Sequence, residues 1–386
     1  MPALVIAVIK RLVIGLLRAF SRRADETESF LIPAYTGLGN FIMMTPMILA
    51  LRRLHPRARI YILAGNPFGT DQVFRRGDGI VDDVLWLDQR LPSWKKALFF
   101  FRLRARRIAT VFLPFDAAPS FVRWGALLAG IPHHIGHTQG TATEHTEWTF
   151  QVLSRHIAWR RDTHEIDIHF DLLDLLHPGV ARSYETHVGN EGEDTLDRFG
   201  LRGRKYAVVT LSAANAAATA KRWYPERYAA LIALLNRDGF TVALPGDRNE
   251  VAMIGEFAER HGLDVVNLAG KTSITEVSTI IKHAALMVAH DTGLMQIGNA
   301  HHVPMVVMFG PSDIFLAAPK SPRSLVIYKA LPCSPCMKNF QKSDSEALRD
   351  CPINVQCMRD ISVEEVYRAC KDVLAAVRPS GDESPL

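Results

Sequence analysis

The chain of 386 residues contains five cysteines, and none of them lies before residue 333. A disulfide framework therefore cannot hold the main fold together, and this sparse usage indicates a reducing compartment. The chain also lacks a long apolar run. Two apolar runs near its start, residues 4–9 and 12–17, are separated by Lys10 and Arg11, and both are too short to span a bilayer.

A large excess of charge of either sign is missing as well. Lys and Arg number 45 and Asp and Glu 40, so the formal net charge is only +5. This balance is too weak to indicate nucleic-acid binding, but it suits an anionic substrate or an anionic membrane surface. With 48% hydrophobic and 22% charged residues, the composition is that of a globular protein long enough for two domains with separate cores.

Residues 1–27 predict an amphipathic helix and a linker. In a secretory signal the charges precede the apolar core and a small-residue cleavage site follows it, and this segment does not have that order. On a helix Arg11, Arg18 and Arg22 share one face, which is typical of an interfacial helix on anionic lipid. An amphipathic helix packed on the body of the protein explains the pattern equally well.

From residue 30 onward, short apolar runs alternate with amphipathic stretches of helical period. This alternation indicates α/β domains in which helices cover both faces of a parallel sheet. We predict a domain at residues 28–190, a second at 191–360 with a Cys-containing segment at 331–358, and a C-terminal helix and tail at 361–386. The predicted strands are residues 30–35, 58–64, 83–87, 109–115, 206–211, 240–244, 264–268, 285–290 and 305–309.

The best-defined βα unit lies at residues 285–311. Its first strand ends in the turn Asp291-Thr292-Gly293, which opens a helix over residues 294–301. Such a turn lies at the carboxyl edge of a parallel sheet, where the N–H groups and the dipole of the next helix favour a phosphate. Many βα turns carry these residues simply to cap a helix, so this pattern alone is a modest indication.

Two better-known nucleotide motifs are broken. The glycine loop at residues 36–40 would need a glycine in place of Ile42 to match G-x-G-x-x-G. The stretch at residues 269–272 imitates the end of a P-loop, but its leading glycine would have to replace Val265. Neither a dinucleotide-binding nor an ATPase motif is therefore complete.

Several short motifs nonetheless follow one another in a consistent order. In the first half they are Gly39-Asn40, Thr45-Pro46 and Ala-Leu-Arg at residues 50–52. In the second half they are Lys-Arg-Trp-Tyr-Pro-Glu at 221–226, Gly-Asp-x-x-Glu at 246–250, Leu-Ala-Gly-Lys-Thr-Ser at 268–273, Asp-Thr-Gly-Leu at 291–294 and Phe-Gly-Pro-Ser at 309–312. Over roughly residues 30–370 this set resembles the heptosyltransferase-like enzymes of glycosyltransferase family 9.

The resemblance implies a GT-B fold, in which two Rossmann-like domains face a cleft, with the donor on the C-terminal domain and the acceptor on the N-terminal one. It implies inverting transfer of a heptose-like sugar from a nucleoside diphosphate donor, such as an ADP-sugar, to a lipid-linked or cell-envelope glycan such as the lipopolysaccharide core. No cofactor, catalytic metal or nucleic acid is expected. The protein would be cytoplasmic and peripheral at the inner face of the cytoplasmic membrane.

The resemblance also implies roles for individual residues. Lys221 would act in catalysis as a point charge on the diphosphate, and Glu250 would accept hydrogen bonds from two ribose hydroxyls. A first-turn acid facing a helix dipole explains Glu250 as well. The implied donor-binding set is Ser212, Lys221, Glu250, Asp291, Thr292, Gly293, Leu294 and Gln296.

Two positions depart from the family pattern. Asn40 stands where members commonly carry an Asp that is a plausible general base, and an amide cannot take a proton at neutral pH. Gln296 stands where the family often has a His. Either another residue is the base, or the protein is a catalytically degenerate nucleotide-sugar-binding protein. Another GT-B enzyme, such as a nucleotide-sugar epimerase, is a further alternative.

Two clusters of residues contain potential metal ligands. No spacing in the first matches a known zinc pattern, so we interpret it as an ordinary surface loop: His133, His134, His137 and His145. The second gives C-x2-C and then C-x5-C, and it consists of Cys333, Cys336, Cys351 and Cys357. Four thiolates could hold zinc, but the second spacing exceeds the usual two to four residues. We therefore favour reduced structural thiols and keep a metal as the weaker alternative.

Overall fold

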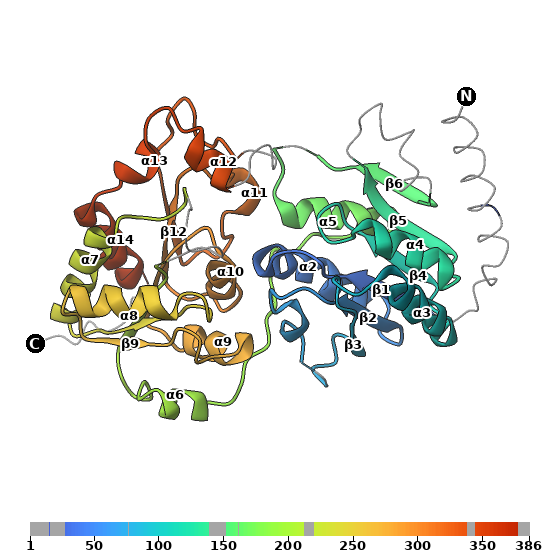
Figure 1. Ribbon diagram of the computed structural model, residues 1–386, viewed down its shortest axis with the longest axis horizontal. Coiled ribbons are helices and arrows are strands. Elements are labelled where there is room, and N and C mark those ends of the chain that lie inside the picture. Colours follow the sequence, from blue (N-terminus) through green and yellow to red (C-terminus); the bar gives the residue numbers. More distant parts are fainter. Residues whose placement is uncertain are drawn as a thin grey trace, which may run out of the picture. The chain divides into compact units, whose positions relative to one another are not determined.

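The computed structural model (Figure 1) describes residues 15, 28–75, 77–138, 152–160, 162–211, 220–337 and 344–376. The chain divides into two compact units, Met1–Glu185 and Thr186–Leu386, and each has its own sheet. Both units are α/β, which confirms the predicted fold class. Apart from Gly15, the helix expected in residues 1–27 lies outside the described residues, and no helix within them is long and apolar enough to cross a membrane.

The N-terminal unit holds a six-stranded parallel sheet in the spatial order β3-β2-β1-β4-β5-β6. This is the doubly wound order of a Rossmann fold, in which the winding reverses at the central pair β1 and β4. The strands are β1 Ser29–Pro33, β2 Arg59–Ala64, β3 Asp83–Trp86, β4 Thr110–Leu113, β5 His133–Thr138 and β6 Arg155–Ala158.

Strand β5 shows that the expectation of a histidine-rich surface loop was wrong. His134 and His137 are buried in this strand, and each ring Nε2 lies 2.9 Å from a backbone oxygen, of Ile131 and Ile168 respectively. A hydrogen bond offsets part of the cost of burying a polar ring. An inner strand can therefore carry histidines at positions where the hydrophobic periodicity of the sequence would predict apolar residues. His145 lies outside the described residues.

Helices pack in pairs on the N-terminal sheet, α2 on α5 and α3 on α4. Leu31 of β1 and Val111 of β4 belong to the core that includes Phe100 of α3. Helix α2 continues through Pro46, which has no N–H, because the Ile42 carbonyl accepts from Thr45 Oγ1 at 2.7 Å instead. The helices are α2 Leu38–Leu54, η1 Thr70–Gln72, α3 Ser93–Leu103, η2 Arg104–Arg106, α4 Ser120–Leu128 and α5 Glu165–Asp174.

The C-terminal unit repeats the architecture, with six parallel strands in the order β12-β11-β10-β7-β8-β9. Here the winding reverses between β7 and β10. The strands are β7 Tyr206–Val209, β8 Thr241–Leu244, β9 Val265–Asn267, β10 Leu286–His290, β11 Met305–Phe309 and β12 Ser324–Tyr328.

Local signals placed several helices of this unit. The Ser273 hydroxyl accepts from the Glu276 N–H while the Glu276 carboxylate accepts from the Ser273 N–H, so the predicted capping box of α9 is confirmed. Helix α14 packs on α7, β11 and β12 of its own unit. The helices are α6 Asp194–Arg198, α7 Pro225–Arg237, α8 Val251–Arg260, α9 Ile274–Lys282, α10 Gly293–Ala300, α11 Ile314–Ala317, α12 Asp344–Arg349, α13 Gln356–Arg359 and α14 Val363–Ala375.

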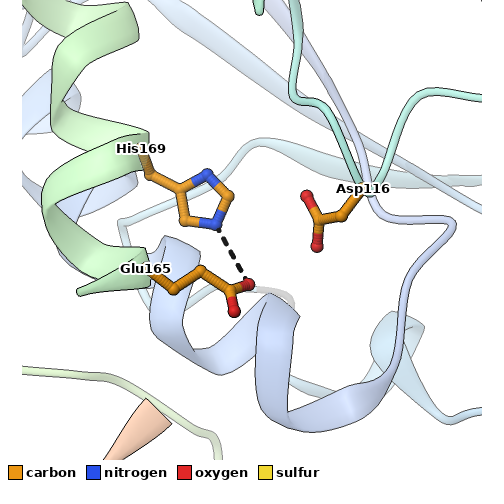
Figure 2. A group of neighbouring side chains, drawn as sticks. All are labelled: Asp116, Glu165 and His169. Atoms are coloured by element: carbon orange, nitrogen blue, oxygen red, sulfur yellow. Dashed lines mark ion pairs between the residues drawn. The ribbon is translucent and has the colours of Figure 1, made fainter. Parts of the chain in front are cut away.

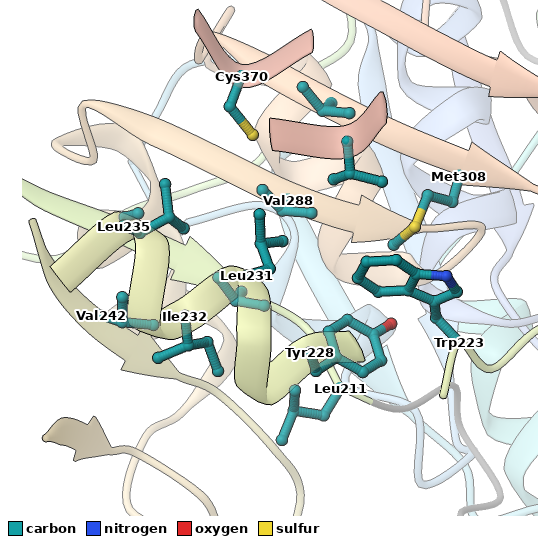
Figure 3. Packing of buried hydrophobic residues seen from close by; sticks show 14 of the residues in the cluster. Leu211, Trp223, Tyr228, Leu231, Ile232, Leu235, Val242, Val288, Met308 and Cys370 are labelled. Atoms are coloured by element: carbon teal, nitrogen blue, oxygen red, sulfur yellow. The ribbon is translucent and has the colours of Figure 1, made fainter. Parts of the chain in front are cut away.

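The core of the C-terminal unit anchors the chain just before α7 (Figure 3). Trp223 is 1% exposed, and its Nε1 donates to the Ile361 carbonyl at 3.0 Å. The Tyr228 ring packs edge-on against it, with centroids 5.1 Å apart. Because Trp223 is held in this way, the neighbouring Lys221 leaves the core at a defined place.

Candidate functional site

In each sheet the loops that follow two adjacent central strands run in opposite directions, because the winding of the sheet reverses there. In open α/β sheets this switch point, outside the carboxyl ends of the strands, is where ligands bind. It lies between β7 and β10 in the C-terminal unit and between β1 and β4 in the N-terminal unit. Polar side chains gather at both places.

At the C-terminal switch point, Lys221 and Asp291 join two loops. Lys221 lies in the connection from β7 to α7 and Asp291 follows β10, and the Lys221 Nζ is 2.6 Å from Asp291 Oδ2. The two side chains are 20% and 17% exposed. The carboxylate therefore holds the ammonium group at the sheet edge, where an anion can still reach it.

Thr292 is the N-cap of α10. Its backbone is extended, and its Oγ1 accepts from the Met295 N–H at 3.2 Å. This cap uses one lone pair of the hydroxyl and leaves the O–H group able to donate. The helix begins at Gly293, and the first N–H groups of a helix have no intrahelical acceptor and carry the positive end of its dipole. The turn thus has the features that favour an anion.

Glu250 closes the loop between β8 and α8. It is 9% exposed and occupies the N-cap position of α8, and its Oε2 accepts from the Asp247 N–H at 2.7 Å. A Cβ on Gly246 would approach Ile254 Cδ1 to 2.6 Å and Glu250 Cβ to 3.2 Å, so a side chain at this position would displace both neighbours. The Gly-Asp-x-x-Glu motif therefore has a local structural reason, and it keeps a carboxylate at the edge of the sheet.

The other residues of the implied donor set have different positions. Gln296 is 2% exposed, and its Nε2 donates to the Ala317 carbonyl at 2.9 Å, so it joins α10 to α11. Leu294 is half-buried on the first turn of α10. Ser212 lies outside the described residues.

The N-terminal switch point brings Asn40 close to three titratable side chains. Thr36 Oγ1 donates to Asp116 Oδ2 at 2.8 Å, which joins the loop after β1 to the loop after β4. Asn40, in the first turn of α2, donates from Nδ2 to Glu165 Oε2 at 3.2 Å. Glu165 begins α5, and His169 Nε2, one turn later, lies 3.4 Å from Glu165 Oε1 (Figure 2).

Burial dominates the electrostatics of this group. It raises the pKa of Glu165 to about 7; the charge of Asp116 adds to the rise, and contacts with His169 and Asn40 oppose it. Burial and the neighbouring His169 lower the pKa of His137 on β5 to about 3, so that ring stays neutral. A carboxyl group that titrates near neutral pH beside a second carboxylate is suited to proton transfer.

Asp116, Glu165 and His169 also have the residue types of a cation site. Their ligand-type atoms lie within 4.8 Å of one another, close enough for one hydroxyl group or one small cation to contact them together. Sequence reasoning missed all three. Asp116 carried a usable signal because it directly follows a predicted strand, and Glu165 and His169 have the i, i+4 spacing of one helix face.

The cysteines of the C-terminal segment are free thiols, with Cys333 exposed and Cys357 buried. Burial raises the pKa of Cys357 to about 11, and the neighbouring Cys336, Cys351 and Cys333 add to the rise. Among the described residues these sulfur atoms do not form a three-residue group as tight as the one around Glu165. Reduced structural thiols remain our interpretation, with a metal as the weaker alternative.

Comparison with known proteins places the chain among sugar transferases. The family description Glycosyltransferase family 9 (heptosyltransferase) matches residues 124–346, more than half of the chain. Lipopolysaccharide heptosyltransferase 3 of Escherichia coli K12 is 24% identical over 373 residues, which cover 90% of this chain and 98% of that protein. Lipooligosaccharide heptosyltransferase 2 of Haemophilus influenzae is 32% identical over 156 residues, and the match covers 38% of this chain and 45% of that relative.

A solved structure of E. coli ADP-heptose lps heptosyltransferase II shares the fold, with a TM-score of 0.72 at 20% identity over 91% of this chain and 99% of that one. The two doubly wound units are thus the two domains of a GT-B fold. Since the family description covers more than half of its length, the chain belongs to glycosyltransferase family 9, the heptosyltransferase family.

Proposed function

We propose that the protein is an inverting glycosyltransferase that moves a heptose-like sugar from an ADP-sugar to a lipid-linked or cell-envelope glycan such as the lipopolysaccharide core. The observation that carries the proposal is the Lys221–Asp291 ion pair beside the N-terminus of α10, at the switch point of the C-terminal sheet. Family membership supports the reaction class. The names of the relatives support lipopolysaccharide as the acceptor class and ADP-heptose as the donor.

The chemistry of the leaving group explains this arrangement. As the bond between the sugar and the diphosphate breaks, negative charge grows on the phosphate oxygens, and fixed donors aimed at them stabilise the transition state. Lys221 supplies a full positive charge and Thr292 an O–H donor. Gly293 and the first turn of α10 add N–H groups and the helix dipole. Glu250, at the neighbouring β8 edge, accepts from the ribose hydroxyls.

We place the reaction at the inner face of the cytoplasmic membrane, with the protein bound peripherally. All five cysteines are free, as expected in a reducing compartment. The Arg11, Arg18 and Arg22 side chains of the N-terminal segment supply the attraction to anionic lipid. The acceptor is lipid-linked, so binding at the surface would bring the enzyme to it.

The test combines the purified protein, ADP-heptose and lipopolysaccharide that is truncated before its last core heptose. Mass spectrometry should show that the acceptor gains one heptose, and calorimetry should show that ADP binds without acceptor. UDP-sugars and GDP-sugars are the donor controls. ADP binding without transfer to any truncated acceptor would indicate a degenerate binding protein. Conversion of the donor sugar without acceptor would indicate an epimerase instead.

A further inference from the structure

Buried polar atoms that lack a close hydrogen-bond partner lie near one another beside Asn40. Asp116, Glu165 and His169 converge on one point at the carboxyl edge of the N-terminal sheet (Figure 2). Asp116 Oδ1 and His169 Nδ1 are buried and make no hydrogen bond with the described residues, and Glu165 Oε1 and His169 Nε2 are only loosely paired, at 3.4 Å. Buried polar atoms normally have a partner. The group is therefore arranged to receive a further polar group.

Asp116 is the most accessible member of the group. It is half-buried, whereas Glu165 and His169 are 1% and 0% exposed. Among the described residues no Lys or Arg pairs with Asp116, whereas Asp88, which follows β3, is paired with Arg90 at 2.9 Å. The negative charge of Asp116 is therefore not neutralised by an ion pair with a described residue.

We propose that Asp116 is the general base of the glycosyl transfer proposed above, on which this inference rests. Glu165 is then a positioning residue behind Asp116. Asp116 takes the proton of the acceptor hydroxyl while the acceptor oxygen forms its bond to the anomeric carbon of the sugar. The bond from that carbon to the diphosphate oxygen breaks, and its electron pair leaves with the nucleoside diphosphate. Asp116 later returns the proton to water. Thr36, which donates to Oδ2 at 2.8 Å, orients the carboxylate.

Glu165 makes the reaction depend on pH. Its pKa of about 7 means that its carboxyl group is neutral in mild acid and negative in mild base. A second negative charge beside Asp116 makes the pair a stronger proton acceptor. The groups that face Glu165 are Asp116 from the loop after β4, His169 from α5 and Asn40 from α2, while His137 of β5 stays neutral behind His169. We therefore expect kcat/KM to rise as the pH passes through about 7.

The test uses the full chain in the heptose-transfer assay over a range of pH, with ADP calorimetry as a second readout. Asp116→Asn keeps an acceptor for Thr36 but cannot take a proton, so kcat should fall by about a hundredfold to ten-thousandfold with ADP affinity unchanged. Glu165→Gln should keep measurable turnover and lose the rise near pH 7. Asp88→Asn and Asp167→Asn, which alter carboxylates paired with arginines, are matched controls and should behave like wild type.

Each other outcome overturns the assignment. Asp116→Asn with kcat within threefold of wild type would remove its role as base. An inactive Glu165→Gln beside an active Asp116→Asn would make Glu165 the base. Activity lost in a chelator and restored by a divalent cation would mean that the group holds a metal. Wild-type protein that binds ADP but never transfers heptose would instead refute the proposed function itself, and the role of Asp116 with it.

Discussion

Replacing Lys221 with alanine removes the positive charge that Asp291 holds 2.6 Å away at the C-terminal switch point. A charge-assisted hydrogen bond to a phosphate is worth about 1.5–3 kcal/mol. The Kd for ADP should therefore rise by about 10- to 150-fold, since about 1.4 kcal/mol corresponds to a factor of ten. The variant also leaves the Asp291 carboxylate, 17% exposed, without its cation beside a diphosphate. Their repulsion should move the loss toward the upper end of this range.

Isothermal calorimetry with ADP at low and high salt measures this loss, and thermal melting shows whether the fold is kept. Lys221→Arg keeps the charge and is the matched control, with a Kd close to that of wild type. The double variant Lys221→Ala, Asp291→Asn removes the repulsion and should recover part of the lost affinity. If Lys221→Ala binds ADP within twofold of wild type, the pair is structural and the diphosphate binds elsewhere.

Thr292→Val should weaken ADP binding by about 1–3 kcal/mol because it removes the O–H donor, while Thr292→Ser should retain it; equal affinity in all three proteins would exclude the hydroxyl. Asn40→Asp places a carboxylate where an amide donated to Glu165 at 3.2 Å, so the rise in kcat/KM near pH 7 should move to higher pH. Activity found only in Asn40→Asp would favour the degenerate alternative. Deleting residues 1–23 should abolish sedimentation with anionic vesicles at low salt and leave ADP binding intact; equal sedimentation of both forms would favour a packed helix.

The donor side could be predicted from the sequence because its signals are local. Pro225 at the first turn and Gly239 beyond the last one marked α7, and the Ser273 capping box marked α9. Asp291 and Thr292 directly follow an apolar strand. Parallel strands end at a common edge, so their place at that edge followed from the order of elements alone.

The strands that could not be predicted from the sequence form because segments distant in the chain pack beside them. β5 buries His134 and His137 inside the sheet, where backbone oxygens compensate for their polarity. β6 and β12 are edge strands with partly exposed residues, so they lack a clear apolar pattern. Such segments become strands because a neighbouring strand in the sheet forms backbone hydrogen bonds with them. The sequence of the segment alone does not reveal that neighbour.

The sequence by itself determined that an amide stands at position 40, and it did not identify which residue accepts the proton of the acceptor hydroxyl. Only the tertiary structure brought Asp116 and Glu165 to that place. The order of strands is a property of the packed sheet: β4 lies beside β1 although β2 and β3 come between them in the chain. The contact of Asn40 with Glu165 spans 125 positions. Periodicity specifies which face of a helix or strand is buried, but a contact between remote residues exists only after the strands are ordered.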